Sequence, residues 1–295
     1  MQLGALAPFG DIGGDPATVK EYALGIEAIG YDFLEVPDHV LGQDPAKAAG
    51  GRLADGLYHD PFVVLGYLAG IAPKLGFSTG VLILAQRQTA LVAKQAACLD
   101  VLCGGRFRLG VGVGWNEAEF IGLNENFHNR GKRSEEQVQV MQALWAAPFA
   151  TLNGKYHTID GAGINPRPAS GRVPVWYGGH HEHTLPRIAK WGDGWMPNAY
   201  PPDQSALDIF SRLHRLTEQA GRDPKAVGIE VWVSCGAGGE ADWRTEAAFW
   251  KAAGASHLCL TTTFGMRHHK RIAGKTMGDH LAALRRYHAA VADIL

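Results

Sequence analysis

Eight short hydrophobic segments alternate with amphipathic segments along the chain. Apolar residues in the amphipathic segments recur at helical spacing, as at Val19, Tyr22, Ala23, Ile26 and Ile29. Eight strand-then-helix units are the number that a (β/α)8 TIM barrel requires, whereas open sheets of alternating units usually stop at about six strands. The pattern therefore predicts an α/β barrel, as a single domain over residues 1–295, with strands at Leu3–Leu6, Phe33–Val36, Phe77–Leu84, Phe107–Val113, Val173–Tyr177, Gly194–Met196, Gly228–Val233 and His257–Thr261.

Two segments interrupt this repeat. Residues 39–60 form an insertion after the second strand, and residues 148–172 form one before the fifth strand. Long loops of low periodicity in a compact domain are usually functional. The first insertion leaves the carboxyl end of a strand, where barrel active sites form, so we expect it near the site. The second precedes a strand, on the opposite face, which favours a structural or oligomer-contact role.

The fourth predicted strand carries glycine at every second position. Alternation sends Phe107, Leu109, Val111 and Val113 to one face and Arg108, Gly110, Gly112 and Gly114 to the other. Such glycines indicate a flat ligand or another backbone close by, and tight barrel packing is the alternative. The dinucleotide motif G-x-G-x-x-G fails here, because its third glycine would fall at Trp115 or at Glu117. We therefore expect these glycines to face the barrel interior.

One titratable pair follows a strand directly. Asp38 and His39 come after the second strand, at the end of the barrel where catalytic groups collect. An imidazole with a carboxylate beside it is suited to donating or accepting a proton. The alternative is that Asp38 caps a turn and His39 packs on the inserted loop.

A second constellation follows the fifth strand. Gly178 and Gly179 precede His180, and a helix is predicted to open there, so backbone N–H groups could point at an anion such as a phosphate. The competing interpretation of His180, His181 and His183 is a metal site. Their spacing lacks the i, i+4 pattern of helical zinc ligands and no cysteine accompanies them, so we expect no metal.

Composition and charge exclude several classes of function. The formal net charge is −1, which gives no sign of a nucleic-acid partner. No apolar run approaches the length of a membrane helix, and the N-terminus lacks the basic region of a signal peptide, so we expect no membrane association. The four cysteines show no C-x-x-C spacing, which favours a reduced, cytoplasmic location.

Several motifs together resemble one family. They are Gly-Gly-Arg-Phe-Arg-Leu-Gly-Val-Gly-Val-Gly-Trp-Asn-Glu-Ala-Glu-Phe at 104–120, Arg-Gly-Lys-Arg at 130–133, Pro-Val-Trp-Tyr-Gly-Gly at 174–179 and Trp-Gly-Asp-Gly-Trp-Met-Pro at 191–197. The chain resembles the luciferase-like monooxygenase superfamily over essentially its whole length, most closely the coenzyme F420-dependent oxidoreductases. The resemblance implies a (β/α)8 barrel whose mouth binds F420 or FMN.

The resemblance also implies roles for individual residues. His39, with Asp38, would handle a proton beside the deazaflavin. Gly80 and Val81 would form a bulge with a cis peptide bond behind the central ring. The remaining cofactor-binding candidates are Gly112, Gly114 and Trp115 near the ring and Gly178, Gly179 and His180 at the phosphate. Arg52, Arg130, Lys132 and Arg133 are candidates for the acidic tail of F420, and a solvated helix start is the alternative for residues 130–133.

The chain also departs from the family pattern. Residues 85–89 read Ala-Gln-Arg-Gln-Thr where many relatives have proline and Arg-Asn-Pro, and Trp115 stands where the related sugar-phosphate dehydrogenases have glutamate. The absence of that glutamate, together with an unmatched set of sugar-phosphate-binding basic residues, argues against a sugar-phosphate substrate. Trp115 then indicates an apolar wall, or simply a packing tryptophan.

We therefore expect hydride transfer between bound F420 and a small organic substrate. The first alternative is a two-component monooxygenase that uses reduced FMN and oxygen, and the second is a catalytically silent cofactor-binding barrel. The resemblance further implies a homodimer, with a flavin or F420 reductase as a conceivable partner. The substrate pocket of such a barrel is built by its variable loops.

Overall fold

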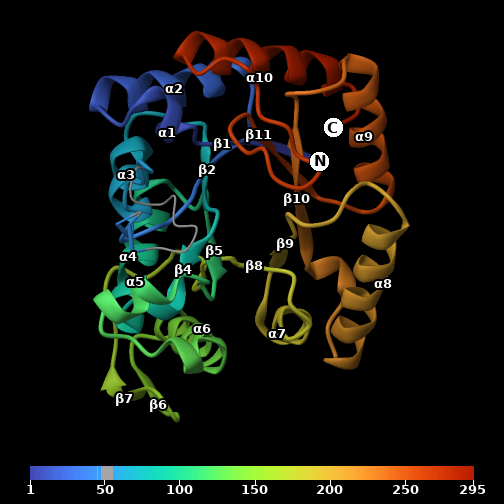
Figure 1. Ribbon diagram of the computed structural model, residues 1–295. Helices are drawn as coiled ribbons and strands as arrows, with labels where there is room; N and C mark the ends of the chain where they lie inside the picture. The colour runs from blue at the N-terminus through green and yellow to red at the C-terminus, as the bar shows by residue number, and fades with distance from the viewer. Residues whose placement is uncertain (45, 48–55) are drawn as a thin grey trace.

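The computed structural model describes residues 1–44, 46–47 and 56–295 and shows a closed parallel barrel (Figure 1). Its strands are paired in the order β3-β2-β1-β11-β10-β9-β8-β5-β4, and a further pairing of β3 with β5 closes the ring. The α/β-barrel prediction is confirmed. The strands are β1 (Gln2–Leu6), β2 (Phe33–Val36), β3 (Gly76–Thr79), β4 (Leu82–Ile83), β5 (Phe107–Gly112), β8 (Val175–Gly178), β9 (Gly194–Met196), β10 (Gly228–Ser234) and β11 (His257–Thr261).

Helices surround the strands (Figure 1). The first long helix, α2, packs beside the last helix, α10, on the side of the barrel where the first strand, β1, pairs with the last strand, β11. No described helix is long and apolar enough to span a membrane. The helices are α1 (Phe9–Ile12), α2 (Pro16–Ile29), α3 (Pro61–Ala69), α4 (Thr89–Leu102), α5 (Glu117–Gly122), α6 (Arg130–Ala146), α7 (Thr184–Trp191), α8 (Gln204–Gln219), α9 (Glu240–Ala252) and α10 (Met277–Val291), with short 3-10 turns η1 (Leu84–Gln86), η2 (Phe127–Asn129) and η3 (Pro224–Ala226).

Several helices begin at a side chain that accepts hydrogen bonds from the first free amides. Asp15 caps α2 and Asp60 caps α3, each followed by a proline at the first helical position. Thr276 and Asp279 form a reciprocal capping box at the start of α10. These caps fix where each helix leaves the loop at the barrel mouth.

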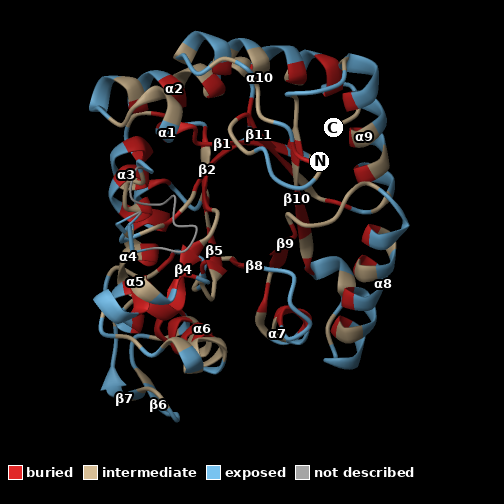
Figure 2. Ribbon diagram, viewed as in Figure 1, coloured by how far each residue is buried: buried red, intermediate tan, exposed pale blue. Residues whose placement is uncertain are grey.

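Figure 2 shows which residues are buried, and their apolar side chains form one large group and two small ones, of which one contains Ile83, Ala85 and Phe120. The large group fills the layer between strands and helices and includes Leu34, Phe107 and Val111. The other small group contains Leu6, Phe33 and Cys259 and lies inside the barrel. Inward and outward residues thus alternate along each strand, as in other barrels of this size.

Most differences between the predicted and the observed strand boundaries are of one residue, as at Gln2, Gly76, Gly178 and Ser234, and three differences have a local explanation. The predicted strand 77–84 is divided into β3 and β4 at the Gly80–Val81 peptide bond, which is cis, as the resemblance implied. The fifth predicted strand begins at Val175, because Pro174 has no N–H to add to the ladder. The fourth ends at Gly112 and not at Val113, just before Gly114 takes a φ of 72°.

The structure describes the second insertion in full and the first insertion only in part. In the first, residues 45 and 48–55 lie outside the described residues. The second contains an antiparallel hairpin of β6 (Ala150–Asn153) and β7 (Thr158–Ala162). His157 near its tip hydrogen-bonds to Glu136 of α6 at 2.8 Å and to Thr89 of α4 at 2.7 Å. The hairpin therefore lies against the helical layer, and its oligomer-contact role stays a prediction.

Candidate active site

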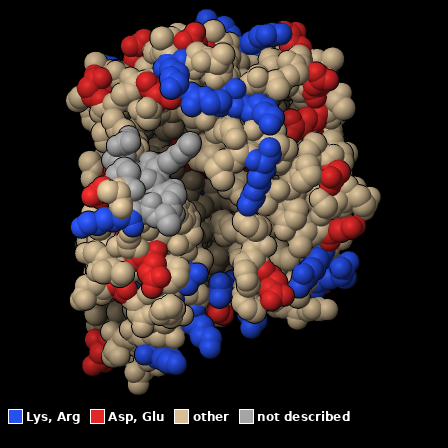
Figure 3. Space-filling model, viewed as in Figure 1, with Lys and Arg blue, Asp and Glu red and all other residues tan. Residues whose placement is uncertain are grey.

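A cavity of about 680 Å³ lies at the carboxyl ends of the strands. Figure 3 shows a hollow near the middle of the face that Figure 1 presents. Active sites of (β/α)8 barrels lie at this end, and the volume is within the usual range for a small-molecule site. All ten residues proposed for the site from the sequence line this cavity: Asp38, His39, Gly80, Val81, Gly112, Gly114, Trp115, Gly178, Gly179 and His180. Their contact with a cofactor stays a prediction.

Asp38 is held by groups other than His39. Its carboxylate accepts hydrogen bonds from the Ile83 amide at 3.0 Å and from Arg87 at 2.8 and 3.3 Å. Arg87 also pairs with Asp60 at 2.8 Å. Burial opposes the charge of Arg87, but these two carboxylates outweigh burial and raise its pKa. The expected pairing of Asp38 with His39 is therefore wrong, because Asp38 is already satisfied by the backbone and by Arg87.

The carboxylate beside His39 is Glu119 of α5. His39 Nδ1 lies 3.2 Å from Glu119 Oε2, and the amides of Val40 and Leu41 donate to Glu119 Oε1 at 2.8 and 3.2 Å. Burial acts to raise the pKa of Glu119, but these hydrogen bonds lower it below its ordinary value. An ionised carboxylate only accepts hydrogen bonds, so Nδ1 carries the proton. Nε2 has no hydrogen-bond partner among the described residues.

Glu119 was missed in the sequence, although it belongs to the motif Trp115-Asn-Glu-Ala-Glu119-Phe. Asn116 caps α5, and the first turn of the short helix turns Glu119 and Phe120 inward. The available signal was that Glu119, the second acidic residue of this motif, stands next to the apolar Phe120. The rings of Tyr58 and Trp115 pack edge-on against His39, with centroids 4.8 and 6.1 Å away. These rings confine the imidazole at the cavity wall.

Gly110 and Gly112 of β5 face the barrel interior, as predicted, but neighbouring protein atoms take up the space beside them. Gly114 lies after the end of β5, and a Cβ there would lie 2.6 Å from Ile83 and 3.1 Å from Phe120. A Cβ on Gly110 would lie 1.9 Å from the carbonyl oxygen of Thr79. A Cβ on Gly112 would lie 2.5 Å from Val81, and one on Gly178 would lie 2.8 Å from Val81. The tight-packing alternative therefore holds at Gly110 and Gly112. Gly112 and Gly178 seat the Val81 side chain, which forms part of the cavity wall.

The loop after β8 forms another part of the wall. Gly179 has a φ of 97°, a conformation that favours glycine. Helix α7 begins only at Thr184 and not directly after Gly179 as expected, since Pro186 is tolerated within the first helical turn but not deeper. Ser134, Thr184 and Arg187 add polar groups to the same cavity.

The basic residues expected to meet an acidic tail are mostly engaged elsewhere. Arg130 donates to the carbonyls of Gly114 and Phe127, and Arg133 pairs with Glu125. Lys132 is exposed, and Arg52 lies outside the described residues. Arg130 and Arg133 therefore brace the loops around the site.

A charged cluster lies inside the barrel, below the cavity. Arg108 donates to Glu230 at 2.7 Å and stacks over the rings of Phe33 and Trp176. Burial and the adjacent Glu230 raise the pKa of Glu35 well above its ordinary value. Glu35 also accepts a hydrogen bond from Trp232, a cavity residue, at 3.0 Å.

Metal ligation is the competing interpretation of His180, His181 and His183, which follow β8. Among the described residues, the ligand-type side chains that lie close enough together to hold an ion are Glu35, Glu230 and Cys259. Arg108 already supplies the positive charge in that cluster. His180 instead lies 3.4 Å from the guanidinium of Arg267, and burial, followed by Arg267, lowers its pKa.

Comparison with known proteins places the chain in a family. The luciferase-like monooxygenase family model matches residues 1–292. An uncharacterized protein of Mycobacterium tuberculosis is 34% identical over 211 residues, covering 68% of this chain and 71% of that protein. An FMNH2-dependent dimethylsulfone monooxygenase of Pseudomonas fluorescens is 30% identical over 147 residues, covering 49% of this chain and 39% of that protein.

A solved structure shows the same fold. It is an F420-dependent secondary alcohol dehydrogenase in complex with an F420-acetone adduct, with a TM-score of 0.74, 20% sequence identity and 98% of each chain covered. Proteins named for F420 and for reduced FMN thus both occur among the similar proteins. The chain belongs to the luciferase-like monooxygenase family of oxidoreductases.

Proposed function

We propose that this protein transfers a hydride between coenzyme F420, bound in the 680 Å³ cavity, and a small organic substrate. The observation that carries the proposal is the His39–Glu119 pair on the cavity wall, because hydride transfer to or from an oxygen- or nitrogen-bearing carbon requires a matching proton. F420, when bound, supplies a two-electron hydride carrier.

Glu119 prepares His39 for proton transfer. By accepting from Nδ1 it fixes the ring orientation and leaves Nε2 for the substrate. When Nε2 takes a proton, the adjacent carboxylate stabilises the imidazolium, and when Nε2 gives it up the neutral tautomer is already in place. Asp38 becomes a positioning residue, because its bonds to Ile83 and Arg87 fix the end of β2 just before His39.

The cavity has the features that a deazaflavin needs. The side chain of Val81, seated between Gly112 and Gly178, provides an apolar wall for a flat ring. Gly179, Thr184 and Arg187 provide an amide, a hydroxyl and a guanidinium for a phosphate. Trp115 and Tyr58 lie beside His39 and add aromatic surface to the cavity wall next to the imidazole.

An anaerobic assay tests this function. The purified protein is given F420 and a panel of alcohols and, separately, reduced F420 with a panel of ketones, imines and enones. We expect a change in cofactor absorbance that depends on one of the substrates and does not need oxygen. Turnover that occurs only with reduced FMN and oxygen would contradict the proposal.

The second candidate function is an FMN-dependent monooxygenase, supported by the FMNH2-dependent relative of Pseudomonas fluorescens. It needs reduced flavin from a reductase, and its product gains an oxygen atom. Oxygen uptake with reduced FMN and isotopic oxygen in the product distinguish it from hydride transfer. The homodimer and the reductase partner stay predictions.

A further inference from the structure

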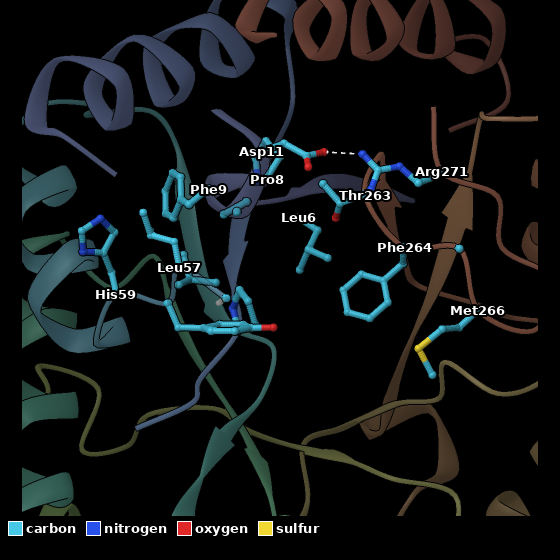
Figure 4. Close-up of a pocket in the computed structure, with 17 residues that line it drawn as sticks. Leu6, Pro8, Phe9, Asp11, Leu57, His59, Thr263, Phe264, Met266 and Arg271 are labelled. Carbon is cyan, nitrogen blue, oxygen red and sulfur yellow. Dashed lines mark hydrogen bonds and ion pairs between the residues drawn. The ribbon is translucent and has the colours of Figure 1, made fainter. Parts of the chain in front are cut away.

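A second cavity, of about 430 Å³, adjoins the first (Figure 4). Four residues line both: Pro37, Tyr58, Phe264 and Met266. The Tyr58 ring packs against His39, with centroids 4.8 Å apart. A molecule in the second cavity therefore lies one aromatic ring away from the imidazole that we assign to proton transfer.

The second cavity has an apolar side and a polar end. Leu6, Phe9, Leu57, Phe264 and Met266 surround most of it (Figure 4). Asp11 and Arg271 meet at one end. Polar and apolar surface contribute about equally to the lining. In a small-molecule site, convergent polar groups fix the orientation of the ligand.

Asp11 and Arg271 are firmly placed but not fully used. Arg271 Nη2 donates to Asp11 Oδ2 at 2.8 Å. Fully buried His280, which bonds to Thr262 at 2.8 Å, has its Nε2 3.4 Å from the same oxygen. Asp11 Oδ1 and Arg271 Nη1 have no hydrogen-bond partner among the described residues. One acceptor and one donor therefore remain at the polar end.

The charges at this end cancel. A carboxylate or phosphate on the free Nη1 of Arg271 would lie beside the Asp11 carboxylate, and a cation on the free Oδ1 of Asp11 would lie beside the Arg271 guanidinium, so like-charge repulsion disfavours both. An uncharged group that both donates and accepts satisfies the free atoms of both residues and leaves the ion pair intact.

We propose that this second cavity is the substrate pocket and that Asp11 and Arg271 select a substrate with an uncharged head group that both donates and accepts hydrogen bonds, carried on a compact apolar body. The inference rests on the proposed function, since the head group serves as a remote anchor in the second cavity and the reacting carbon extends past the shared residues into the larger cavity, which His39 lines.

Four probes with the same ring test the selection: cyclohexanecarboxamide, cyclohexanemethanol, cyclohexanecarboxylate and cyclohexylammonium. Their dissociation constants are measured on the full-length protein by ligand-observed NMR. We expect the two uncharged probes to bind about tenfold tighter than either charged probe. Equal or tighter binding of the carboxylate, or no binding of the uncharged probes, would overturn the proposal.

Two variants invert the selection. Asp11→Asn leaves Arg271 without its counter-charge, so the carboxylate probe should become the tightest by about tenfold, and Arg271→Gln should favour the ammonium probe to a similar extent. A merely structural pair would weaken all the probes alike and keep their order. Thermal unfolding checks that each variant is folded, and the unmodified protein already tests the proposal if one is not.

F420 titration of the same proteins separates this inference from the proposed function. We expect F420 affinity to change less than about twofold in both variants, because neither residue lines the larger cavity. Binding of F420 without the probe inversion would overturn the substrate inference alone. Probe inversion without F420 binding would overturn the proposed function and leave the ligand selection standing.

Discussion

One group of charged side chains lies inside the barrel and another lies at its mouth, and the two differ in whether a ligand can contact them. Inside, Arg108, Glu35 and Glu230 are enclosed by aromatic rings and balance one another. At the mouth, Glu119 is equally buried, but its partner His39 lines a large cavity. The same residue types therefore serve different purposes: the inner group governs stability, and the outer group presents one imidazole to a ligand.

The largest effect should follow from His39→Ala. A positioned imidazole accelerates proton transfer roughly 10²–10⁴-fold, so turnover should fall on that scale while F420 still binds. Single-turnover kinetics and cofactor titration measure the two quantities separately. Glu119→Gln is the matched variant and should lose less, about 10–100-fold, because the imidazole remains. Unchanged turnover in His39→Ala would show that the group at the mouth has no role in catalysis.

Arg108→Met should mainly affect stability. It leaves Glu230 buried without its cation, and breaking a buried pair costs about 3–5 kcal/mol. Urea unfolding measures the loss. The control is Arg286→Met, which removes a solvent-exposed pair with Glu240 and should change stability little. If the two variants are equally stable, the inner cluster is not a stability element.

Gly112→Ala tests the part of the cavity wall that the Val81 side chain forms. The added Cβ would lie 2.5 Å from Val81, and overpacking of this kind costs about 1–3 kcal/mol. We also expect weaker cofactor binding, because Val81 must shift. The double variant with Val81→Ala should recover stability. The control is Gly66→Ala in α3, where nothing lies within 4 Å of the new Cβ. If the double variant does not recover stability, Val81 is not the side chain that the new Cβ displaces.

The smallest effect concerns pH. The pKa of Glu35 is raised in the folded protein, so the unfolded chain releases this proton at lower pH, and Glu35 reduces stability as pH rises above about 4.5. Glu35→Gln removes that proton difference and can keep the hydrogen bond from Trp232. Its stability relative to the original protein should rise between pH 5 and 8, by less than about 1.4 kcal/mol for each pH unit. A pH-independent difference would show that Glu35 is ionised when folded.

Local patterns predicted the barrel well, because strand alternation and helical spacing depend on neighbouring residues. Asp38 and His39 were found because a barrel gathers strand ends at one mouth. Their partners were not, since Glu119 is 80 residues from His39 and Arg87 is 49 residues from Asp38. Only the packing of α5 and η1 on the loop after β2 decides which carboxylate meets which cation.

The glycines of β5 show the same limit. The sequence predicted that they face inward, but two explanations stayed open, a ligand or close packing. The backbone turn at Gly80 and Val81 decides between them by placing the Val81 side chain against Gly112 and Gly178. The start of α7 was misplaced by a few residues because Pro186 is tolerated only in the first turn of a helix, so the helix begins at Thr184.

Equilibrium titration of the purified protein with F420 and, separately, with FMN tests the central claim most directly. Cofactor fluorescence reports binding, and riboflavin serves as the control that lacks a phosphate. The account predicts saturable binding of F420, at least about tenfold tighter than FMN, with riboflavin the weakest of the three. Tight binding of FMN together with no binding of F420 would contradict it.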